Sequence, residues 1–382
     1  MLRVAIDASA MPRQLAGAGV YTYQLVRALA ATSGDHELFV FARPGLFDEL
    51  AAQQARLRVI HVDPSSRASR FLWEQARLPT LLRRLRIDVL HSPHHHTPFL
   101  LRRPSSVRTP RRVVTFHDVT FLLLPQRYPL GRRLYMTAVT NAAAEVADAV
   151  ITPSETVRRD VIDKLGVTSD RIVAIPEAAA PQYAPVEDED VLGRMRSKYQ
   201  LPSRYILSVG SLEPGKNRAR LILAYARLRS EGLDCPLVVV GQPAWHYQGD
   251  RYVARALQLD EHVRYLGYVP DEDLPALYRG ATLLAFPSLY EGFGLPVLEA
   301  MACGTPVVTA NVSALPEVAG DAALQVDPRN IDALAEAMGR LLSDDTLHAD
   351  LRARGLERAK QFSWERTARE TLSVYQAVAT EA

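Results

Sequence analysis

The stretch Ser288-Leu-Tyr-Glu-Gly-Phe-Gly-Leu-Pro-Val-Leu-Glu-Ala-Met-Ala-Cys-Gly-Thr-Pro-Val-Val308 carries the most information about the fold. The apolar run before it reads as a strand that ends near Pro287, and a glycine-rich loop follows. Pro296 suits the first turn of a helix, where its missing N–H costs nothing. Gly304 suits the carboxyl-terminal cap of that helix, and residues 305–309 begin another strand. The stretch therefore predicts a strand, a glycine loop, a helix and a second strand.

The same alternation of short β-branched runs with helical patterns extends along the whole chain, and it is typical of parallel sheets wrapped by helices. In the first half, we expect strands at 3–7, 37–42, 57–61, 88–91, 112–116, 149–152 and 171–175. In the second half, we expect them at 205–210, 237–241, 263–266, 281–286, 305–309 and 323–326. The predicted fold class is α/β, with two doubly wound, Rossmann-like domains.

The length of 382 residues is too great for one ordinary hydrophobic core. Residues 176–202 contain several prolines and an acidic run, and they read as a linker followed by a short helix. We expect an N-terminal domain over 1–180, a C-terminal domain over 181–361, and a helix over 362–382 that packs back on the N-terminal domain. Hydrophobic residues make up 48% and charged residues 23%, which excludes disordered, collagenous and coiled-coil proteins.

Positive charge is concentrated between residues 65 and 135, where 14 arginines stand against three acidic residues and the net charge is +11. Apolar residues such as Phe71, Trp73 and Phe99 lie among them. This combination favours contact with an anionic membrane face or an anionic acceptor, although a solvated arginine-rich surface is the alternative. No nucleic-acid-binding module accompanies the charge, so nucleic acid is not an expected partner.

The expected compartment is the cytoplasm. Cys235 and Cys303 cannot form a disulfide framework or complete a four-ligand zinc site, which fits a reducing environment. Residues 1–7 read as a buried strand, no export signal is visible, and no apolar run is long enough for a transmembrane helix. Peripheral contact with the inner membrane face remains open.

The glycine loop of the opening stretch is the first candidate site, because ligands of doubly wound sheets bind beyond the carboxyl ends of the strands. A glycine loop that opens a helix presents free N–H groups and the positive end of the helix dipole, which suits a phosphate. Glu291 and Glu299 flank this loop, so both should be stabilised as anions that accept sugar hydroxyls. We expect Glu291 to orient a sugar ring and Glu299 a ribose. The alternative is that Glu299 caps backbone groups and Glu291 is merely exposed.

The loop 208–217 supplies the second candidate, Lys216. Only four lysines occur in the chain against 41 arginines, so a lysine at a strand end is less expected as a surface residue without a role. We expect Lys216 to bind phosphate, and an exposed loop lysine is the alternative. In the first half, Gly17 to Gly19 precede a helix that should begin near Val20, but the third glycine of a dinucleotide fingerprint is missing.

Histidines are the remaining candidates. His117 and Asp118 follow the strand 112–116 and place a hydrogen-bonding pair at the sheet edge. A second group lies in a proline-bounded loop, and adjacent histidines rarely converge on one metal ion, so acceptor binding or a surface position is expected for His91, His94, His95 and His96.

Taken together, these motifs resemble the retaining GT-B glycosyltransferases of family four, whose hallmark is a pair of glutamates separated by seven residues around a Gly-Phe-Gly-Leu-Pro loop. The resemblance covers nearly the whole chain and is strongest to bacterial mannosyl- and rhamnosyltransferases of surface polysaccharide synthesis. It rests on the Gly-rich first loop, the two glutamates, and the segments 116–118, 152–154, 210–214, 267–270, 315–317 and 362–364. Many members carry an arginine where Ser211 or Gly215 stands here, so charge neutralisation would either depend more heavily on Lys216 or use Arg218 or Arg220.

The resemblance implies two facing domains with an interdomain cleft, a nucleotide sugar held mainly by the C-terminal domain, and an acceptor in the N-terminal domain. It gives catalytic roles to His117, Glu291 and Lys216, with His117 approaching the sugar across the cleft. The implied donor-binding residues are Gly17, Ala18, Gly19, Asp118, Gly210, Ser211, Lys216, Gly267, Tyr268, Val269, Glu291, Gly292, Phe293, Gly294, Leu295 and Glu299.

The expected reaction is a retaining hexosyl transfer that needs no metal and no cofactor, because fixed donors and a lysine can stabilise the departing diphosphate. GDP-mannose is the first expectation for the donor and a UDP-hexose is the second. The acceptor is expected to be a glycan or a polyprenyl-diphosphate-linked glycan. A nucleotide-sugar epimerase and a non-catalytic sugar-nucleotide-binding protein are the alternatives. A glycosidase fits less well, since it needs a protonated carboxyl group.

Overall fold

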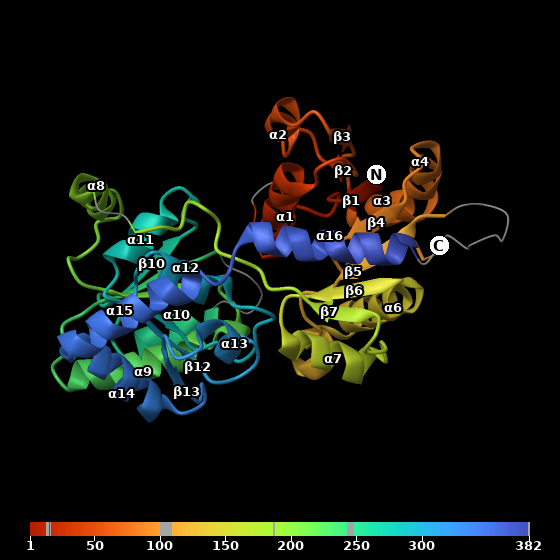
Figure 1. Ribbon diagram of the computed structural model, residues 1–382. Coiled ribbons are helices and arrows are strands. Elements are labelled where there is room, and N and C mark those ends of the chain that lie inside the picture. The colour runs from red at the N-terminus through yellow and green to blue at the C-terminus, as the bar shows by residue number, and fades with distance from the viewer. Residues whose placement is uncertain (13–14, 16, 100–108, 186–187, 243–247, 381–382) are drawn as a thin grey trace. The chain divides into compact units, whose positions relative to one another are not determined.

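The computed structural model describes residues 1–12, 15, 17–99, 109–185, 188–242 and 248–380. They form two compact units (Figure 1). The first unit comprises Met1–Glu177 and Trp364–Ala382, and the second comprises Ala178–Ser363. Among the described helices, none combines the length and the apolar character that crossing a membrane requires.

The first unit is built on a parallel sheet of seven strands in the order β3-β2-β1-β4-β5-β6-β7. The bounds are β1 Arg3–Asp7, β2 Glu37–Ala42, β3 Leu57–His61, β4 Val89–Ser92, β5 Arg111–Thr115, β6 Ala149–Thr152 and β7 Ile172–Ala174. All seven predicted strands are confirmed, each within one residue of the expected bounds. The central strands are buried on both faces, which explains why they read as unbroken apolar runs.

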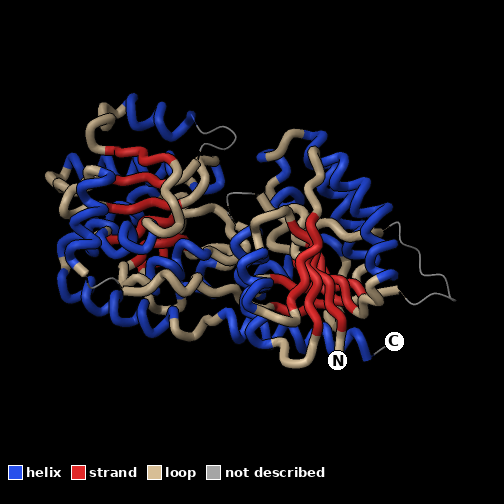
Figure 2. Tube along the Cα trace, turned by 90° about the horizontal axis from the view of Figure 1, so that it is seen from above, coloured by secondary structure: helices blue, strands red, loops and turns tan. Residues whose placement is uncertain are grey.

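Helices cover both faces of this sheet, as Figure 2 shows. They are α1 Ala18–Thr32, α2 Asp48–Gln53, α3 Arg67–Leu72, the π-helix η1 Trp73–Arg77, α4 Leu78–Arg84, α5 Thr120–Leu123, the 3-10 helix η2 Pro125–Arg127, α6 Leu130–Val146, α7 Glu155–Leu165 and α16 Trp364–Thr380. The last helix packs beside α1, and Thr367 Oγ1 donates to the carbonyl oxygen of Pro176 at 2.7 Å. The chain therefore returns to its first unit after completing the second.

The second unit holds a parallel sheet of six strands in the order β10-β9-β8-β11-β12-β13. The bounds are β8 Ile206–Val209, β9 Leu237–Val240, β10 Val263–Gly267, β11 Leu283–Phe286, β12 Val307–Ala310 and β13 Leu324–Val326, each within two residues of the predicted bounds. Its helices are α8 Glu189–Tyr199, the 3-10 helix η3 Pro214–Lys216, α9 Arg218–Ser230, α10 Gln248–Ala256, α11 Leu274–Gly280, α12 Leu295–Ala302, α13 Leu315–Ala319, α14 Ile331–Ser343 and α15 Asp345–Ala359.

Each sheet has one point at which the strand order reverses. In the first unit, β1 and β4 are neighbours although two strands lie between them in sequence, and in the second unit β8 and β11 are neighbours in the same way. At such a point the loops after the two strands lead away in opposite directions, so a crevice opens between them. Both sheets therefore have a defined place for a ligand.

Candidate functional site

The site of the second unit lies where the loops after β8 and β11 meet, at the reversal of strand order. The N–H of Leu289 donates to the carbonyl oxygen of Gly215 at 2.9 Å. Asn217 Nδ2 donates to the carbonyl oxygens of Pro287, at 3.0 Å, and Pro328, at 2.6 Å. Asn217 is buried and directly precedes α9, and its backbone has the left-handed conformation with φ of 59°. One side chain thus joins the loops after β8, β11 and β13.

The two strongest predicted residues bind each other. Lys216 Nζ donates to Glu291 Oε1 at 2.6 Å, and the two side chains are 16% and 15% exposed. Lys216 also lies 5.2 Å above the ring centre of Phe286, the last residue of β11. The expected proximity of the two loops is therefore present. The alternative of an independent surface lysine is wrong, since Lys216 is held in an ion pair.

The loop after β12 supports the same glutamate from another side. The N–H of Glu291 donates to Ser313 Oγ at 3.0 Å, and the N–H of Ala314 donates to the carbonyl oxygen of Glu291 at 3.4 Å. Ser313 has a positive φ of 57°, which is uncommon for serine. The backbone of Glu291 is thus fixed by hydrogen bonds that leave its carboxylate to Lys216.

The glycine loop turns directly into α12, as the sequence predicts. Gly294 occupies the N-cap with φ of 111°, and a Cβ at this position would lie 2.7 Å from Leu315 Cδ2. Gly292 and Leu295 flank the turn, whereas the ring of Phe293 is buried against Phe362. Only the backbone of Phe293 can therefore serve a ligand. An eight-residue helix begins here, with N–H groups at its first turn suited to an anion.

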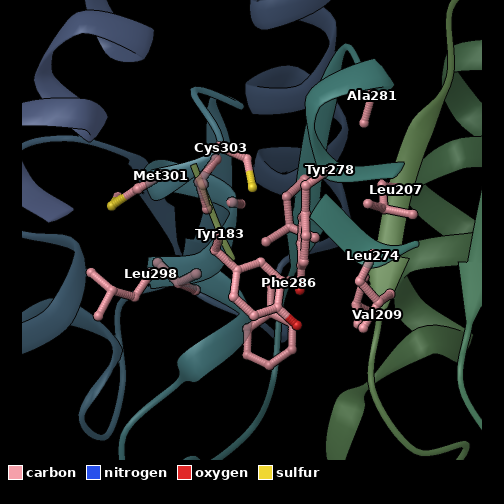
Figure 3. Close-up of a cluster of buried hydrophobic side chains, with 14 of the residues drawn as sticks. Tyr183, Leu207, Val209, Leu274, Tyr278, Ala281, Phe286, Leu298, Met301 and Cys303 are labelled. Atoms are coloured by element: carbon pink, nitrogen blue, oxygen red, sulfur yellow. The ribbon is translucent and has the colours of Figure 1, made fainter. Parts of the chain in front are cut away.

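Glu299 lies on the second turn of α12 and is 9% exposed. Its Oε2 accepts a hydrogen bond from the Tyr278 hydroxyl at 2.7 Å. Burial, followed by the charge of Glu299, raises the pKa of Tyr278. Figure 3 shows Tyr278 within the apolar cluster that also contains Tyr183 and Phe286. Tyr278 was not identified from the sequence, because its role depends on a partner 21 residues away.

Other predicted donor-binding residues lie at the same sheet edge. Gly210 and Ser211 follow β8, and Gly210 has φ of 129°. Gly267 ends β10 with φ of 72°, and its carbonyl oxygen accepts from the N–H of Gly241 at 2.8 Å. Tyr268 is 46% exposed whereas Val269 is buried. The positions after β8, β10 and β11 therefore share the carboxyl edge of one sheet, although no ligand contact is implied by position alone.

In the first unit, the helix after the glycine segment begins at Ala18 and not near Val20, with Gly17 at its N-cap and Gly19 in its first turn. His117 Nδ1 lies 3.3 Å from Glu177 Oε1, and its Nε2 lies 3.2 Å from the carbonyl oxygen of Pro93. Asp118 behaves as a turn residue. Its Oδ1 accepts from the N–H of Thr120 at 2.8 Å and from the Thr120 hydroxyl at 2.6 Å.

The four neighbouring histidines are packing residues to different degrees. His91 is fully buried between the Tyr375 hydroxyl, at 2.6 Å, and Thr115 Oγ1, at 2.8 Å, and burial lowers its pKa to about 3. His95 stacks on Phe116, and His96 is buried. A surface position is therefore wrong for His91 and His96. No group of three or more His, Cys, Asp or Glu in the described ranges is placed to hold a metal ion.

Two buried carboxyl groups at the first reversal point were not identified from the sequence. Asp7 ends β1, with its Oδ2 3.6 Å from His94 Nε2, and Glu74 lies on η1. Burial acts to raise the pKa of Asp7, but the His94 imidazole and Ser9 lower it overall. Burial and the charge of Asp7 raise the pKa of Glu74 to about 8, against a smaller opposite effect of Arg70. The burial of Glu74 could not be predicted from the α-helical repeat of the sequence, because η1 is a π-helix.

The comparisons with known proteins agree with this geometry. Residues 194–361 match the family described as glycosyl transferases group 1, and residues 15–182 match glycosyltransferase family 4. The chain is 35% identical to an O-antigen chain mannosyltransferase B of Escherichia coli, over 94% of this chain and 96% of the relative. It is 37% identical to a D-inositol 3-phosphate glycosyltransferase of Salinispora tropica, over 60% of this chain and 51% of the relative.

The fold comparison points to the same class. A sucrose-phosphate synthase from Thermosynechococcus elongatus matches with a TM-score of 0.80 at 21% identity, and the match covers 100% of both chains. The two doubly wound units and the neighbours in fold define a GT-B glycosyltransferase. The chain belongs to the group 1 and family 4 glycosyl transferases, so the resemblance found in the sequence is confirmed.

The raised pKa of Glu74 predicts a pH-dependent stability that Glu74→Gln should remove. Between about pH 4.5 and 8 the folded chain keeps a proton that the unfolded chain releases, so the free energy of unfolding falls as pH rises, by at most about 1.4 kcal/mol per unit. The charged or polar groups near Glu74 are Asp7, Arg70, Gln75 and Tyr135.

Urea unfolding of the native chain and of Glu74→Gln between pH 5.5 and 8.5 tests this prediction. The variant should gain stability over the native chain progressively toward pH 8.5. The matched control is Glu145→Gln, which replaces an exposed glutamate of α6. The difference in the free energy of unfolding between this variant and the native chain should stay constant with pH. Parallel curves for the native chain and Glu74→Gln would contradict the ionisation assigned to Glu74.

Proposed function

We propose that this glycosyltransferase transfers a hexose to a glycan in polysaccharide synthesis, with mannose from GDP-mannose as the expected donor group. The substrate class is supported by the relative named O-antigen chain mannosyltransferase B, which matches nearly full length. The site observation that carries the proposal is the Lys216–Glu291 ion pair beside the N-terminus of α12. It supports the proposal because a cation and a carboxylate that can accept hydrogen bonds from hydroxyl groups lie together near the start of α12.

The ion pair suggests how the donor is received. Diphosphate is expected to be a stronger partner for the ammonium group than the single carboxylate, and helix N–H groups add to its binding. When the phosphate takes Lys216, Glu291 loses its cation and becomes available to accept hydrogen bonds from sugar hydroxyls. Glu299, held by Tyr278, is expected to accept from the ribose. In this proposal, Lys216 exchanges Glu291 for the phosphate, Glu291 then binds the sugar, and Glu299 binds the ribose.

The chemical step breaks the bond between the anomeric carbon and the phosphate oxygen and forms a bond to the acceptor oxygen. Negative charge grows on the departing diphosphate, where Lys216 and the first-turn N–H groups of α12 stabilise it. We expect retention of configuration, with the acceptor entering on the face that the phosphate leaves and its hydroxyl proton passing to the phosphate oxygen. This charge stabilisation requires no metal ion in the proposed mechanism.

His117 is the candidate of the first unit for contact with the transferred sugar. Its ring is oriented by Glu177 and by the carbonyl oxygen of Pro93, and it packs edge-on against Tyr21 at 4.7 Å between ring centres. These contacts fix the ring and engage both of its nitrogens, so in this role a sugar hydroxyl would take the place of the Pro93 carbonyl at Nε2. The proposed acceptor is either a free glycan or a polyprenyl-diphosphate-linked glycan.

A basic, partly apolar surface of the first unit supports contact with an anionic membrane. Leu72 of α3 and three residues at the start of α6, Leu130, Leu134 and Tyr135, are exposed, and Arg132 and Arg133 share the same turn of α6. Burial raises the pKa of Tyr135, and the charges of Arg70 and Arg67 of α3 act to lower it, so α3 and the start of α6 face the same region. Residues 100–108, with Arg102, Arg103 and Arg108 of the basic window, lie outside the described residues.

The function is tested by a donor panel. The purified chain should form nucleoside diphosphate from GDP-mannose in the presence of a mannan oligosaccharide or a polyprenyl-diphosphate-linked glycan, and thermal shift with GDP, UDP and ADP should be largest with GDP. Preference for UDP and UDP-glucose would establish the UDP-hexose alternative. Conversion of donor without acceptor would indicate an epimerase, and binding without turnover across the acceptors would indicate a sugar-nucleotide-binding protein.

Variants of the ion pair should separate the two roles. Lys216→Ala should lower turnover by roughly 100- to 1000-fold, comparable with loss of one oxyanion donor, and should weaken nucleoside diphosphate binding. Glu291→Ala should abolish most sugar transfer while nucleotide affinity stays equal or increases, because Lys216 is then released. Steady-state kinetics and calorimetric GDP titration measure both. Equal loss of affinity in the two variants would contradict the division of roles.

Membrane contact is tested with vesicles. The chain should co-sediment with vesicles that contain phosphatidylglycerol and not with pure phosphatidylcholine vesicles, and the double variant Leu130→Ser, Leu134→Ser should lose most of this binding. The control pair Leu223→Ser, Leu257→Ser replaces exposed leucines of the second unit and should retain it. Equal binding by both double variants would place the contact elsewhere.

A further inference from the structure

Arg218 is a buried guanidinium behind the loop that carries Lys216. It is the first residue of α9, it is 1% exposed, and its side chain turns back toward the end of β8. Nη1 donates to the carbonyl oxygen of Ser211 at 2.7 Å, and Nη2 donates to the carbonyl oxygen of Gly210 at 2.5 Å. One side chain thus holds two successive carbonyl groups of the loop.

The charge of Arg218 has no ion-pair partner. Among the described residues, no carboxylate forms a salt bridge with it, and its Nε has no hydrogen-bond partner. Burial lowers the pKa of this guanidinium, and the more distant charges of Asp250, Glu213 and Glu291 act in the opposite direction. An arginine stays protonated in proteins, so a positive charge is buried here with carbonyl dipoles as its neighbours. A buried charge is costly unless hydrogen bonds or a counter-charge offset its loss of water, and here the two carbonyl oxygens accept those hydrogen bonds.

The peptide held by Arg218 is fixed from both sides. A Cβ at Gly241 would lie 1.8 Å from the carbonyl oxygen of Gly210, so the end of β9 packs directly against this peptide. The N–H of Leu212 donates to the carbonyl oxygen of Gln242 at 2.8 Å. Because C=O and N–H of a trans peptide point in opposite directions, the N–H of Ser211 is presented on the side away from the guanidinium.

The same loop brings the two cations close together. A Cβ at Gly210 would lie 3.2 Å from Lys216 Cε and 3.6 Å from Arg218 Nη2, so the two side chains flank this glycine. Lys216 is neutralised by Glu291, and the charge of Glu291 also acts on Arg218. The carboxylate therefore binds one positive charge and lies in the field of a second, more distant one. An anion that takes the place of Glu291 beside Lys216 would experience the field of both.

We propose that Arg218 is a positioning residue of the donor site, which clamps the carbonyls of Gly210 and Ser211 away from the diphosphate and adds a fixed positive charge behind the loop. The proposal rests on the proposed function. Arg218 touches no substrate in this role. Neither Ser211 nor Gly215 is a cation, so the second positive charge beside Lys216 comes from Arg218 at the start of α9.

Binding of a nucleoside and of its diphosphate to the same variants tests the proposal. Arg218→Met keeps the length of the side chain and removes the charge. It should weaken GDP binding roughly tenfold or more, while guanosine binding changes by less than about twofold. Arg218→Lys keeps the charge but cannot span both carbonyls with a planar fork, and it should recover part of the GDP affinity. If the donor panel selects uracil, UDP and uridine replace these probes.

The matched control is Arg227→Met on the same helix. Arg227 is exposed and forms surface ion pairs with Glu231 and Asp332, so its loss should leave both affinities unchanged. Equal weakening of nucleoside and diphosphate by Arg218→Met would show a general structural role and overturn the proposal, as would unchanged GDP binding. If Arg218→Met does not fold, Arg218→Lys must still lower the ratio of GDP to guanosine affinity. Failure of the native chain to bind any nucleoside diphosphate would instead refute the proposed function.

Discussion

The interaction on which the site depends is the ion pair between Lys216 and Glu291. It joins the two loops that separate at the reversal of strand order in the second sheet, where an open crevice would otherwise leave two charged side chains in water. In the proposed function, the value of this ion pair lies in the exchange that it permits. A diphosphate would take the ammonium group and release the carboxylate in the same event. The pair therefore keeps both groups oriented until a ligand separates them.

The neutral hydrogen bonds around the pair make that exchange possible without loss of the loop. Asn217 holds the backbone at Pro287 and Pro328, and Ser313 holds the N–H of Glu291. These bonds lie outside the ion pair, so they persist when Lys216 changes partner. Since the backbone is fixed independently of the charges, a ligand needs to displace only one carboxylate. Under the proposed function, donor binding would therefore require only a local rearrangement of two side chains.

The strands and the principal charged residues of the site were predictable from the sequence for a physical reason. Parallel strands buried on both faces read as short apolar runs, and the loops after them must meet at one edge, so Lys216 and Glu291 could be placed together from their positions alone. The contacts of Tyr278 with Glu299, and of Asn217 with Pro328, could not, because they depend on packing between segments 21 and 111 residues apart. Glu74 was missed because a π-helix turns it inward.

The edges of the two sheets differ in charge although both have the same topology. At the second edge, Lys216 pairs with one carboxylate and Arg218 adds a second positive charge farther away, which suits a phosphate-bearing ligand. At the first edge, Asp7 and Glu74 lie close enough for the charge of Asp7 to raise the pKa of Glu74, so two carboxyl groups stand there in place of the cations. The reversal of strand order thus supplies a position for a ligand in each unit, whereas the residues after each strand decide its charge.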